Sequence, residues 1–269
     1  MSSLQRMLTV LDVFSDEVPV WTVEGLVDAL GYTRSTVYRY VKELCEAGLL
    51  APVGRGGYIL GPRIIELDRQ IRDCDPLLTR GRDIVRELMP EMGEGVMFLA
   101  SLLGDDVVSV YQEATPGSIA ISYSRGRPMP LFRGSASRVI LAHLPERRLS
   151  RLFLRHGREI AEAGLGAGWE EFHAALSDMR KRPYLTSRAQ IDPGVFAVSA
   201  PVFDGDGAVM ASLTFVMPED RADREPVEAF ALRVAGGARR LSAAIAEAAS
   251  RAGGRRSRRL AAAGALGSG

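Results

Sequence analysis

Residues 22–48 contain two helix-forming patterns separated by only a few residues, and this arrangement restricts the fold of the N-terminal region more than any other stretch. The first pattern, TVEGLVDAL, starts at Thr22, which can cap a helix start, and is followed by Gly31, which suits a helix end. The second is capped by Thr33 and closes at Gly48. A tight, glycine-containing turn between two short helices predicts a helix-turn-helix.

The flanking segments extend this prediction to a winged helix-turn-helix domain over residues 1–61. Residues 4–14, LQRMLTVLDVF, have apolar side chains at helical spacing and predict an amphipathic first helix. Residues 49–61, LLAPVGRGGYILG, are typical of two short strands around a glycine-rich turn. We therefore expect three helices followed by a β-hairpin.

The helix expected between Thr33 and Gly48 has an apolar side and a polar side. At about 100° per residue, its valines and Leu44 cluster in one direction, while Arg39 and Lys42 point the other way. The polar side of an isolated helix usually faces water. Here the helix follows a tight turn and starts with small hydroxyl residues, which allow close approach to phosphates. We therefore expect this side to enter the major groove of DNA.

Arginine and lysine on this face can reach base edges or phosphates, and tyrosine can contact a phosphate or a thymine methyl group. The expected DNA-binding residues are Thr33, Arg34, Ser35, Thr36, Tyr38, Arg39, Lys42 and, in the hairpin, Arg55. Residues 1–62 carry five basic and seven acidic side chains, a balance that is poor for non-specific DNA binding. A specific operator, bound as a dimer through few ionic contacts, is the better expectation.

The sequence changes in character after residue 61. Residues 62–80 predict a linker helix that ends near Pro76. Strand patterns are then expected at 95–114, 118–126 and 195–217, and helices at 135–157, 169–182 and 221–250. Antiparallel hairpins flanked by helices are typical of an α+β domain with one sheet, which we place at residues 81–250. The Gly- and Arg-rich residues 251–269 are expected to be disordered.

Composition excludes several other classes of protein. Hydrophobic residues make up 46% of the chain, and no run approaches the roughly 18 apolar residues of a membrane span. The two cysteines, Cys45 and Cys74, imply no disulfide framework, so a protein of the reducing cytoplasm is expected. The three histidines lack ligand spacing, so we expect neither a metal nor a cofactor. Nucleophile-elbow, phosphate-loop and zinc-protease motifs do not occur, which argues against an enzyme.

Three stretches together resemble the IclR family of bacterial transcriptional regulators. They are residues 4–67 with gaps, then RPMPLFRGSASRVILAHL at 127–144 and DPGVFAVSAPVFDGDGAVMASL at 192–213. The resemblance extends over roughly residues 3–250. It implies a GAF-like C-terminal α/β domain with an antiparallel sheet, a small effector bound in that domain, and a dimer or dimer of dimers. Ligand would act on the two DNA-binding heads through the helix at 62–80, and either repression or activation is compatible with the residues.

The same resemblance implies an effector site, but with bulkier and more apolar residues than the family usually has there. The expected residues are Phe132, Ser135, Thr186, Phe196, Thr214 and Val216. They favour an aromatic or otherwise hydrophobic effector. Three alternatives stay open: Phe196 and Val216 are plain core residues; the protein has lost its ligand response because Phe196 fills the cavity; or the chain is an enzyme whose winged helix serves protein contacts.

Overall fold

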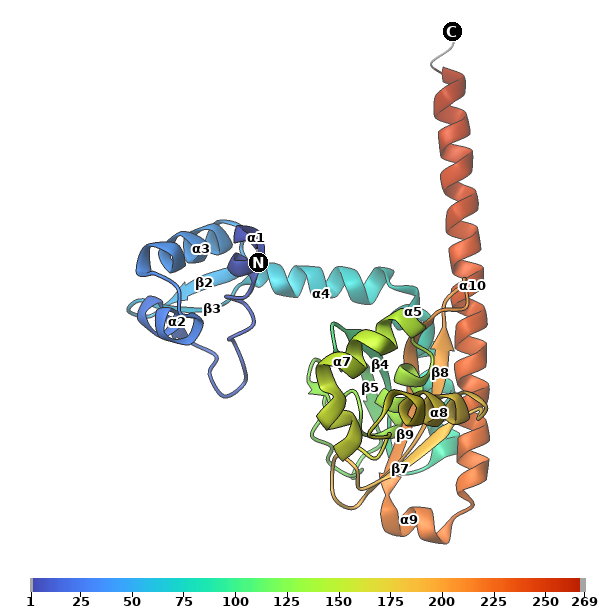
Figure 1. Ribbon diagram of the computed structural model, residues 1–269. Helices are drawn as coiled ribbons and strands as arrows, with labels where there is room; N and C mark the ends of the chain where they lie inside the picture. The colour runs from blue at the N-terminus through green and yellow to red at the C-terminus, as the bar shows by residue number, and fades with distance from the viewer. Residues whose placement is uncertain (1, 267–269) are drawn as a thin grey trace. The chain divides into compact units, whose positions relative to one another are not determined.

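The computed structural model describes residues 2–266 and, of these, the side chains up to Arg251. The chain divides into two compact units between Asp75 and Pro76 (Figure 1). The linker helix predicted over 62–80 is therefore two helices, α4 (Pro62–Cys74) and α5 (Pro76–Met92). Proline disfavours helical backbone in the residue before it, and Asp75 is indeed extended, with φ −72° and ψ 118°. The second unit thus starts earlier than the residue 81 that we predicted.

The first unit is a winged helix-turn-helix. Its further elements are α1 (Ser3–Leu8), β1 (Trp21–Thr22), α2 (Val23–Leu30), α3 (Arg34–Glu46), β2 (Leu50–Val53) and β3 (Gly57–Leu60). The strands pair antiparallel in the order β1-β3-β2, so the predicted hairpin gains a short third strand that we did not foresee. The core of this unit lies between the helices and the hairpin, and its fully buried members include Val10, Leu26, Val37, Leu44 and Leu50.

The helix predicted over residues 4–14 ends at Leu8 instead. The Thr9 hydroxyl donates a 2.8 Å hydrogen bond to the Arg6 carbonyl, a local side-chain bond that competes with continued helix. Residues 9–13 form turns, in which Val10 is fully buried while Leu4 is 71% exposed and Leu8 51% exposed. The apolar face predicted for this helix is therefore only partly directed into the core.

The second unit is built on one six-stranded antiparallel sheet in the order β6-β5-β4-β9-β8-β7. Its strands are β4 (Val96–Leu103), β5 (Asp106–Ala114), β6 (Pro128–Met129), β7 (Leu185–Arg188), β8 (Val195–Phe203) and β9 (Val209–Pro218). The predicted hairpins at 95–114 and 195–217 are confirmed. The strand predicted at 118–126 is absent. Here the Ser122 N–H bonds to the Asp192 carboxylate at 2.8 Å, and Ile119 and Ile121 pack on the core from a loop.

Helices cover both faces of this sheet (Figure 1). The helices α5 and α10 (Val227–Leu266) pack on one face, and α6 (Ser135–Ala142), α7 (Glu146–Glu162) and α8 (Trp169–Arg180) lie on the other. Close approach of α10 depends on a small residue, because a Cβ at Gly237 would lie 2.5 Å from the Leu88 side chain. Alternate residues of β8 enter the two cores: Phe196 and Val198 face α10, whereas Ala197 faces α6.

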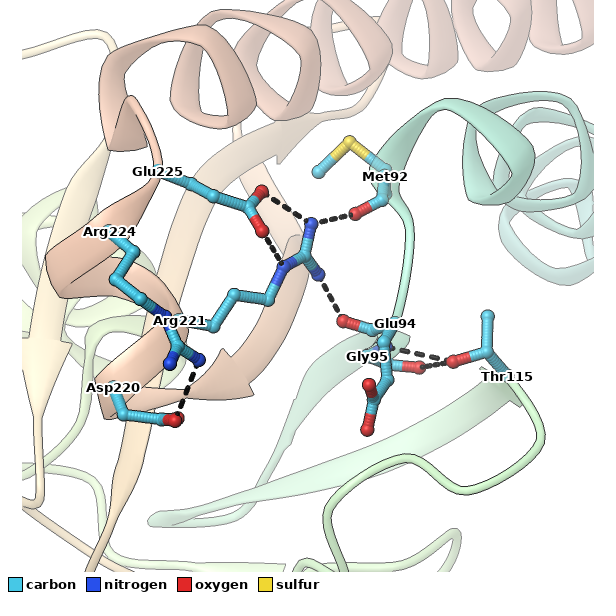
Figure 2. Close-up of polar contacts among 8 residues, drawn as sticks. All are labelled: Met92, Glu94, Gly95, Thr115, Asp220, Arg221, Arg224 and Glu225. Carbon is cyan, nitrogen blue, oxygen red and sulfur yellow. Dashed lines mark hydrogen bonds and ion pairs between the residues drawn. The ribbon is translucent and has the colours of Figure 1, made fainter.

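The helix predicted at 221–250 is interrupted near its start, where Pro226 separates α9 (Glu219–Arg224) from α10. Arg221 holds this corner against the end of α5 (Figure 2). Its guanidinium donates to both Glu225 oxygens, at 2.8 and 2.9 Å, and to the carbonyl oxygens of Met92, at 2.8 Å, and of Glu94. Because only 13% of the Arg221 side chain is exposed, these bonds largely replace its hydration.

The C-terminal end of α10 also differs from the prediction. The helix continues to Leu266, so residues 251–266 are helical where we predicted disorder. Alanine and arginine are strong helix formers, and they outweigh the three glycines of this stretch. Residues 267–269, the end of the predicted disordered tail, lie outside the described residues.

Candidate functional site

The polar face of α3 is the first candidate site, and its helix start is built as the sequence predicts. Gly31 ends α2 in the left-handed conformation, with φ 67°, and the Thr33 hydroxyl accepts a hydrogen bond from the Thr36 N–H at 3.4 Å. Val37 and Val41 are buried, which turns the opposite side of the helix outward. The short turn therefore fixes the direction in which the polar face points from this unit.

The eight predicted DNA-binding residues lie at the surface of the first unit. Tyr38 is 62% exposed, and Thr33, Arg34, Ser35, Arg39, Lys42 and Arg55 are also exposed, while Thr36 is half-buried. Arg55 lies at the tip of the β2–β3 hairpin between Gly54 and Gly56, which both have positive φ. Whether these side chains touch DNA stays a prediction.

The basic side chains of α3 differ in how they are engaged. Arg34 pairs with Glu24 at 2.8 Å and Lys42 with Glu46 at 3.7 Å, both on the surface. The Arg39 guanidinium instead lies 5.5 Å from the centre of the Tyr40 ring. Exposed ion pairs contribute at most about 1 kcal/mol, so they can be exchanged for phosphate contacts.

The second candidate site is a small cavity of about 20 Å³ at the N-terminus of α6, which is room for about one water molecule. Its lining residues are Phe98, Tyr123, Met129, Gly134, Ser135, Ala136, Ser187, Gln190, Ile191, Asp192, Val195, Ala197 and Thr214. They come from β4, β6, β7, β8 and β9, from α6, and from the loops at 115–127 and 189–194. The walls combine aromatic and aliphatic side chains with a compact polar group.

A buried hydrogen-bond network forms the polar wall of this cavity. The Ser135 N–H donates to the Ser187 hydroxyl at 3.0 Å, and the Ser135 hydroxyl lies 2.8 Å from that of Ser199. The Thr214 hydroxyl donates to Ser199 at 2.8 Å, and the Gly134 N–H donates to the Gln190 side-chain oxygen at 2.9 Å. Since α6 has no capping side chain of its own, residues of β7 and of the following loop satisfy its first N–H groups.

The charge of the cavity is one-sided. Asp192 is its only ionisable carboxylate, and none of the residues lining it is basic. Tyr123 is buried in the wall; burial, with the nearby Asp192 charge as a smaller cause, raises the pKa of its phenol well above the ordinary value, so the phenol stays neutral. The cavity thus offers hydroxyl groups and one carboxylate, but no cationic side chain for an anion.

The structure places only two of the six predicted effector residues at this cavity, Ser135 and Thr214. Thr186 is exposed on the other face of β7, and Phe196 packs in the core beneath α10, so Phe196 does not fill the cavity. Successive strand residues point to opposite faces, and the cavity residues are the neighbours Ser187 and Ala197. Phe132 and Val216 are buried on the cavity side of the sheet without lining the cavity.

Sequence reasoning missed Ser187, Gln190, Asp192 and Ser199. The alternation of β8 was a usable signal for Ser199, because apolar and small residues alternate along VFAVSAPVF. The loop residues gave no signal of this kind. Among the described residues, no group of three or more His, Cys, Asp or Glu side chains could hold a metal ion. No helix in that part of the chain is long and apolar enough to cross a membrane.

Comparisons with known proteins match both units. A family model described as the IclR helix-turn-helix domain matches residues 3–54, and one described as the bacterial transcriptional regulator IclR C-terminal domain matches residues 73–243. The HTH-type transcriptional regulator XynR of Escherichia coli is 25% identical over 224 residues, covering 82% of this chain and 88% of that protein. The Pca regulon regulatory protein of Pseudomonas putida is 23% identical over 229 residues, covering 85% and 78%.

Solved structures share the fold. The crystal structure of an IclR transcriptional regulator from Alicyclobacillus acidocaldarius superposes with a TM-score of 0.71 at 22% identity, covering 91% of this chain and 97% of that one. An IclR homologue from Microbacterium hydrocarbonoxydans, crystallised in complex with 4-hydroxybenzoate, gives a TM-score of 0.68 at 19% identity, covering 91% and 99%.

Proposed function

Because the chain belongs to the IclR family of bacterial transcriptional regulators, we propose that it binds a palindromic operator as a dimer and that a small effector changes its affinity for this operator. Its relatives are regulators and not enzymes, so the alternative of an enzyme falls away. The observation that carries the DNA part of the proposal is the outward polar face of α3, held by a buried valine face behind it. Operator binding would take place in the bacterial cytoplasm.

Pairing of two chains is supported by apolar side chains left exposed on two helices of the first unit. These are Leu4 and Leu8 on α1, and Ile65 and Ile71 on α4, with Ile65 73% exposed and Ile71 52% exposed. A second copy would cover them and present two α3 helices, which read half-sites roughly 34 Å apart when successive major grooves are used. Dimers could pair further into a dimer of dimers.

The effector that the cavity supports is small, with an aromatic or apolar body and neutral polar groups. Phe98, Met129 and Ile191 offer apolar walls, and the serine network offers orienting hydrogen bonds. Support for an aromatic body also comes from the 4-hydroxybenzoate bound by the similarly folded Microbacterium protein. A carboxylate of that kind would meet Asp192 here without a cationic partner, so a phenol, amide or hydrazide fits better than an acid.

Effector binding would then act on DNA through the packing of the second unit and through α4. The cavity must widen to admit an aromatic ring. Effector binds the widened state better than the narrow state, so binding increases the population of the widened state. A coupling of about 1–3 kcal/mol would change operator occupancy several-fold to a hundredfold. Repression is the simplest form of such control, in which effector lowers the affinity for the operator.

Two measurements test this function. Fluorescence anisotropy with DNA from upstream of the protein's own gene should show binding that unlabelled random duplex does not displace. A thermal-shift screen of matched pairs, such as 4-hydroxybenzamide against 4-hydroxybenzoate, should show stabilisation by the neutral member. Failure of every upstream fragment to bind would remove the operator proposal, and a preference for the acid would remove the proposed class of effector.

A further inference from the structure

A second concave site lies outside the effector cavity, between α7 and the turn that joins β4 to β5. It has a volume of about 290 Å³ and is lined by Gly104, Asp105, Arg148, Arg151, Leu152 and Arg155. We call it the arginine groove. We propose that this groove binds a small, multiply charged anion with phosphate chemistry, such as a phosphorylated metabolite.

The groove concentrates positive charge on one helix face. Arg148, Arg151 and Arg155 are spaced by three and four residues, so they lie side by side along α7. Leu152, between them in the sequence, is only 3% exposed and anchors this face of the helix to the core. The three guanidinium groups are therefore presented by a helix that packing holds in place.

The charge is only partly neutralised within the protein. Arg155 pairs with the Asp105 carboxylate, and Arg148 donates to the Gly104 carbonyl. Arg151 donates to the Arg147 carbonyl of its own helix at 3.3 Å. A carbonyl carries no net charge, so three arginines face one carboxylate and the lining has a net charge of +2. A dianion bound in the groove would neutralise this charge. Its several oxygens could accept hydrogen bonds from more guanidinium N–H groups than a monovalent ion can.

The other wall of the groove is a tight turn. Gly104 has φ 61° at the first of the two turn positions, as a type II′ hairpin turn requires, and this directs its carbonyl to Arg148. On the helix side, α7 is interrupted at His156, where φ is −121° and ψ is 23°. The His156 Nε2 lies 3.7 Å from the Asp105 carboxylate, beyond hydrogen-bond distance, and has no hydrogen-bond partner among the described residues. The turn and this face of α7 thus form the two walls of the groove.

The size and charge pattern favour a small molecule over a nucleic acid. A volume of about 290 Å³ suits a compact ligand, whereas a DNA backbone needs basic side chains along an open track. The exposed carboxylate of Asp106 follows Asp105 in the chain, outside the lining of the groove, where it would repel the further phosphates of a nucleic-acid backbone. A guanidinium group can donate two parallel hydrogen bonds to two oxygens of one phosphate, so a phosphate group is the anion that suits this lining.

Isothermal titration of the full chain with inorganic pyrophosphate, in a low-salt buffer without phosphate, tests the proposal. We expect about one pyrophosphate per chain, and a loss of affinity of roughly tenfold to a hundredfold in Arg151→Gln, because hydrogen bonds between charged groups are strong. Arg148→Gln should weaken binding in the same direction. Arg158→Gln is the matched control, because Arg158 lies on the same helix, outside the groove, is 90% exposed and pairs with Glu162 at 3.5 Å.

Three results would overturn the proposal. The first is no pyrophosphate binding by the wild-type chain. The second is equal loss in Arg151→Gln and Arg158→Gln, which would mean a diffuse surface effect. The third is displacement of pyrophosphate by random duplex DNA at equal phosphate concentration, which would mean that the arginines contact nucleic acid. None of these outcomes bears on operator binding by α3, so the two proposals are tested separately.

Discussion

The backbone nitrogen of Ser135, the first residue of α6, donates a 3.0 Å hydrogen bond to the hydroxyl of Ser187 in β7. Both residues line the cavity at the start of α6, and both are buried. The helix that covers this face of the sheet is therefore fastened at the point where the proposed effector enters. In the proposed effector complex, the hydroxyl groups that hold α6 in place would also contact the effector.

Replacing Ser187 by alanine should lower the free energy of unfolding by about 1–3 kcal/mol, because the Ser135 N–H is left buried without its acceptor. Urea unfolding followed by circular dichroism measures this. Thr186→Ala is the matched control: Thr186 is the neighbouring residue, exposed on the opposite face, and should change stability by less than about 0.5 kcal/mol. Equal effects of the two substitutions would contradict the placement of Ser187.

Phe196→Ala should cost about 3–5 kcal/mol of stability, since the ring is buried between the sheet and α10. The Arg188 guanidinium lies 5.3 Å from the ring centre and would lose this contact too. The same unfolding assay applies. Effector binding, measured by the thermal shift relative to the unliganded variant, should stay nearly unchanged. If Phe196→Ala keeps its stability and changes only its ligand response, the placement of Phe196 in the core is contradicted, and Phe196 belongs to the effector cavity.

Arg39→Ala should weaken operator binding by about 1–3 kcal/mol if the guanidinium contacts a base, with no change in unfolding. Arg39 is exposed and forms no ion pair in the described part of the chain, so its removal leaves no charge unpaired and breaks only the contact with the Tyr40 ring. Anisotropy titrations at fixed salt measure the loss. Arg69→Ala, an exposed change on α4 where Arg69 pairs with Asp73 at 2.9 Å, should leave operator affinity almost unaltered.

Acid should loosen the corner held by Arg221 and Glu225. Hydrogen bonds from Arg221 lower the pKa of the Glu225 carboxyl below its ordinary 4.5, against a smaller opposing effect of burial. The carboxylate therefore adds stability above pH 4.5, and this contribution disappears as pH falls through the lowered pKa. In Glu225→Gln, the decline of unfolding free energy below pH 4.5 should be shallower than in the wild type.

The control for this pH dependence is Glu247→Gln. Glu247 also pairs with an arginine four residues away, Arg251, at 3.4 Å, but its side chain is 69% exposed. Its removal should leave the acid limb of the stability profile unchanged, because exposed pairs contribute little. If the decline of unfolding free energy at acid pH becomes equally shallow in both variants, the ion pair between Arg221 and Glu225 has no particular role in the pH dependence.

Features that depend on neighbouring residues, such as helix caps and tight turns, were predicted correctly from the sequence. Thr22 and Thr33 cap α2 and α3 as predicted, and the Asp-Gly-Asp-Gly turn joins β8 to β9. These features depend on neighbouring residues alone. The end of α1 was predicted wrongly, because burial of Val10 is decided by contacts with distant residues.

The candidate cavity was predicted less well for the same reason. Whether Phe196 or Ala197 faces the cavity depends on the register of β8 against β7 and β9, which pairs Ala197 with Ser187 and Val216. A shift of one residue moves every side chain to the other face. Asp192 enters the site from a loop, and no periodicity marks a loop residue.

The cavity beside Ser135 has a consequence for the timing of the response. At about 20 Å³ it cannot receive an aromatic ring until the protein opens, so the observed rate of association should stop rising with effector concentration and level off at the opening rate. A cell that uses such a regulator would respond to a compound only after a delay. The delay would be set by the rate at which the cavity at α6 opens, and it would not shorten further when more of the compound is present.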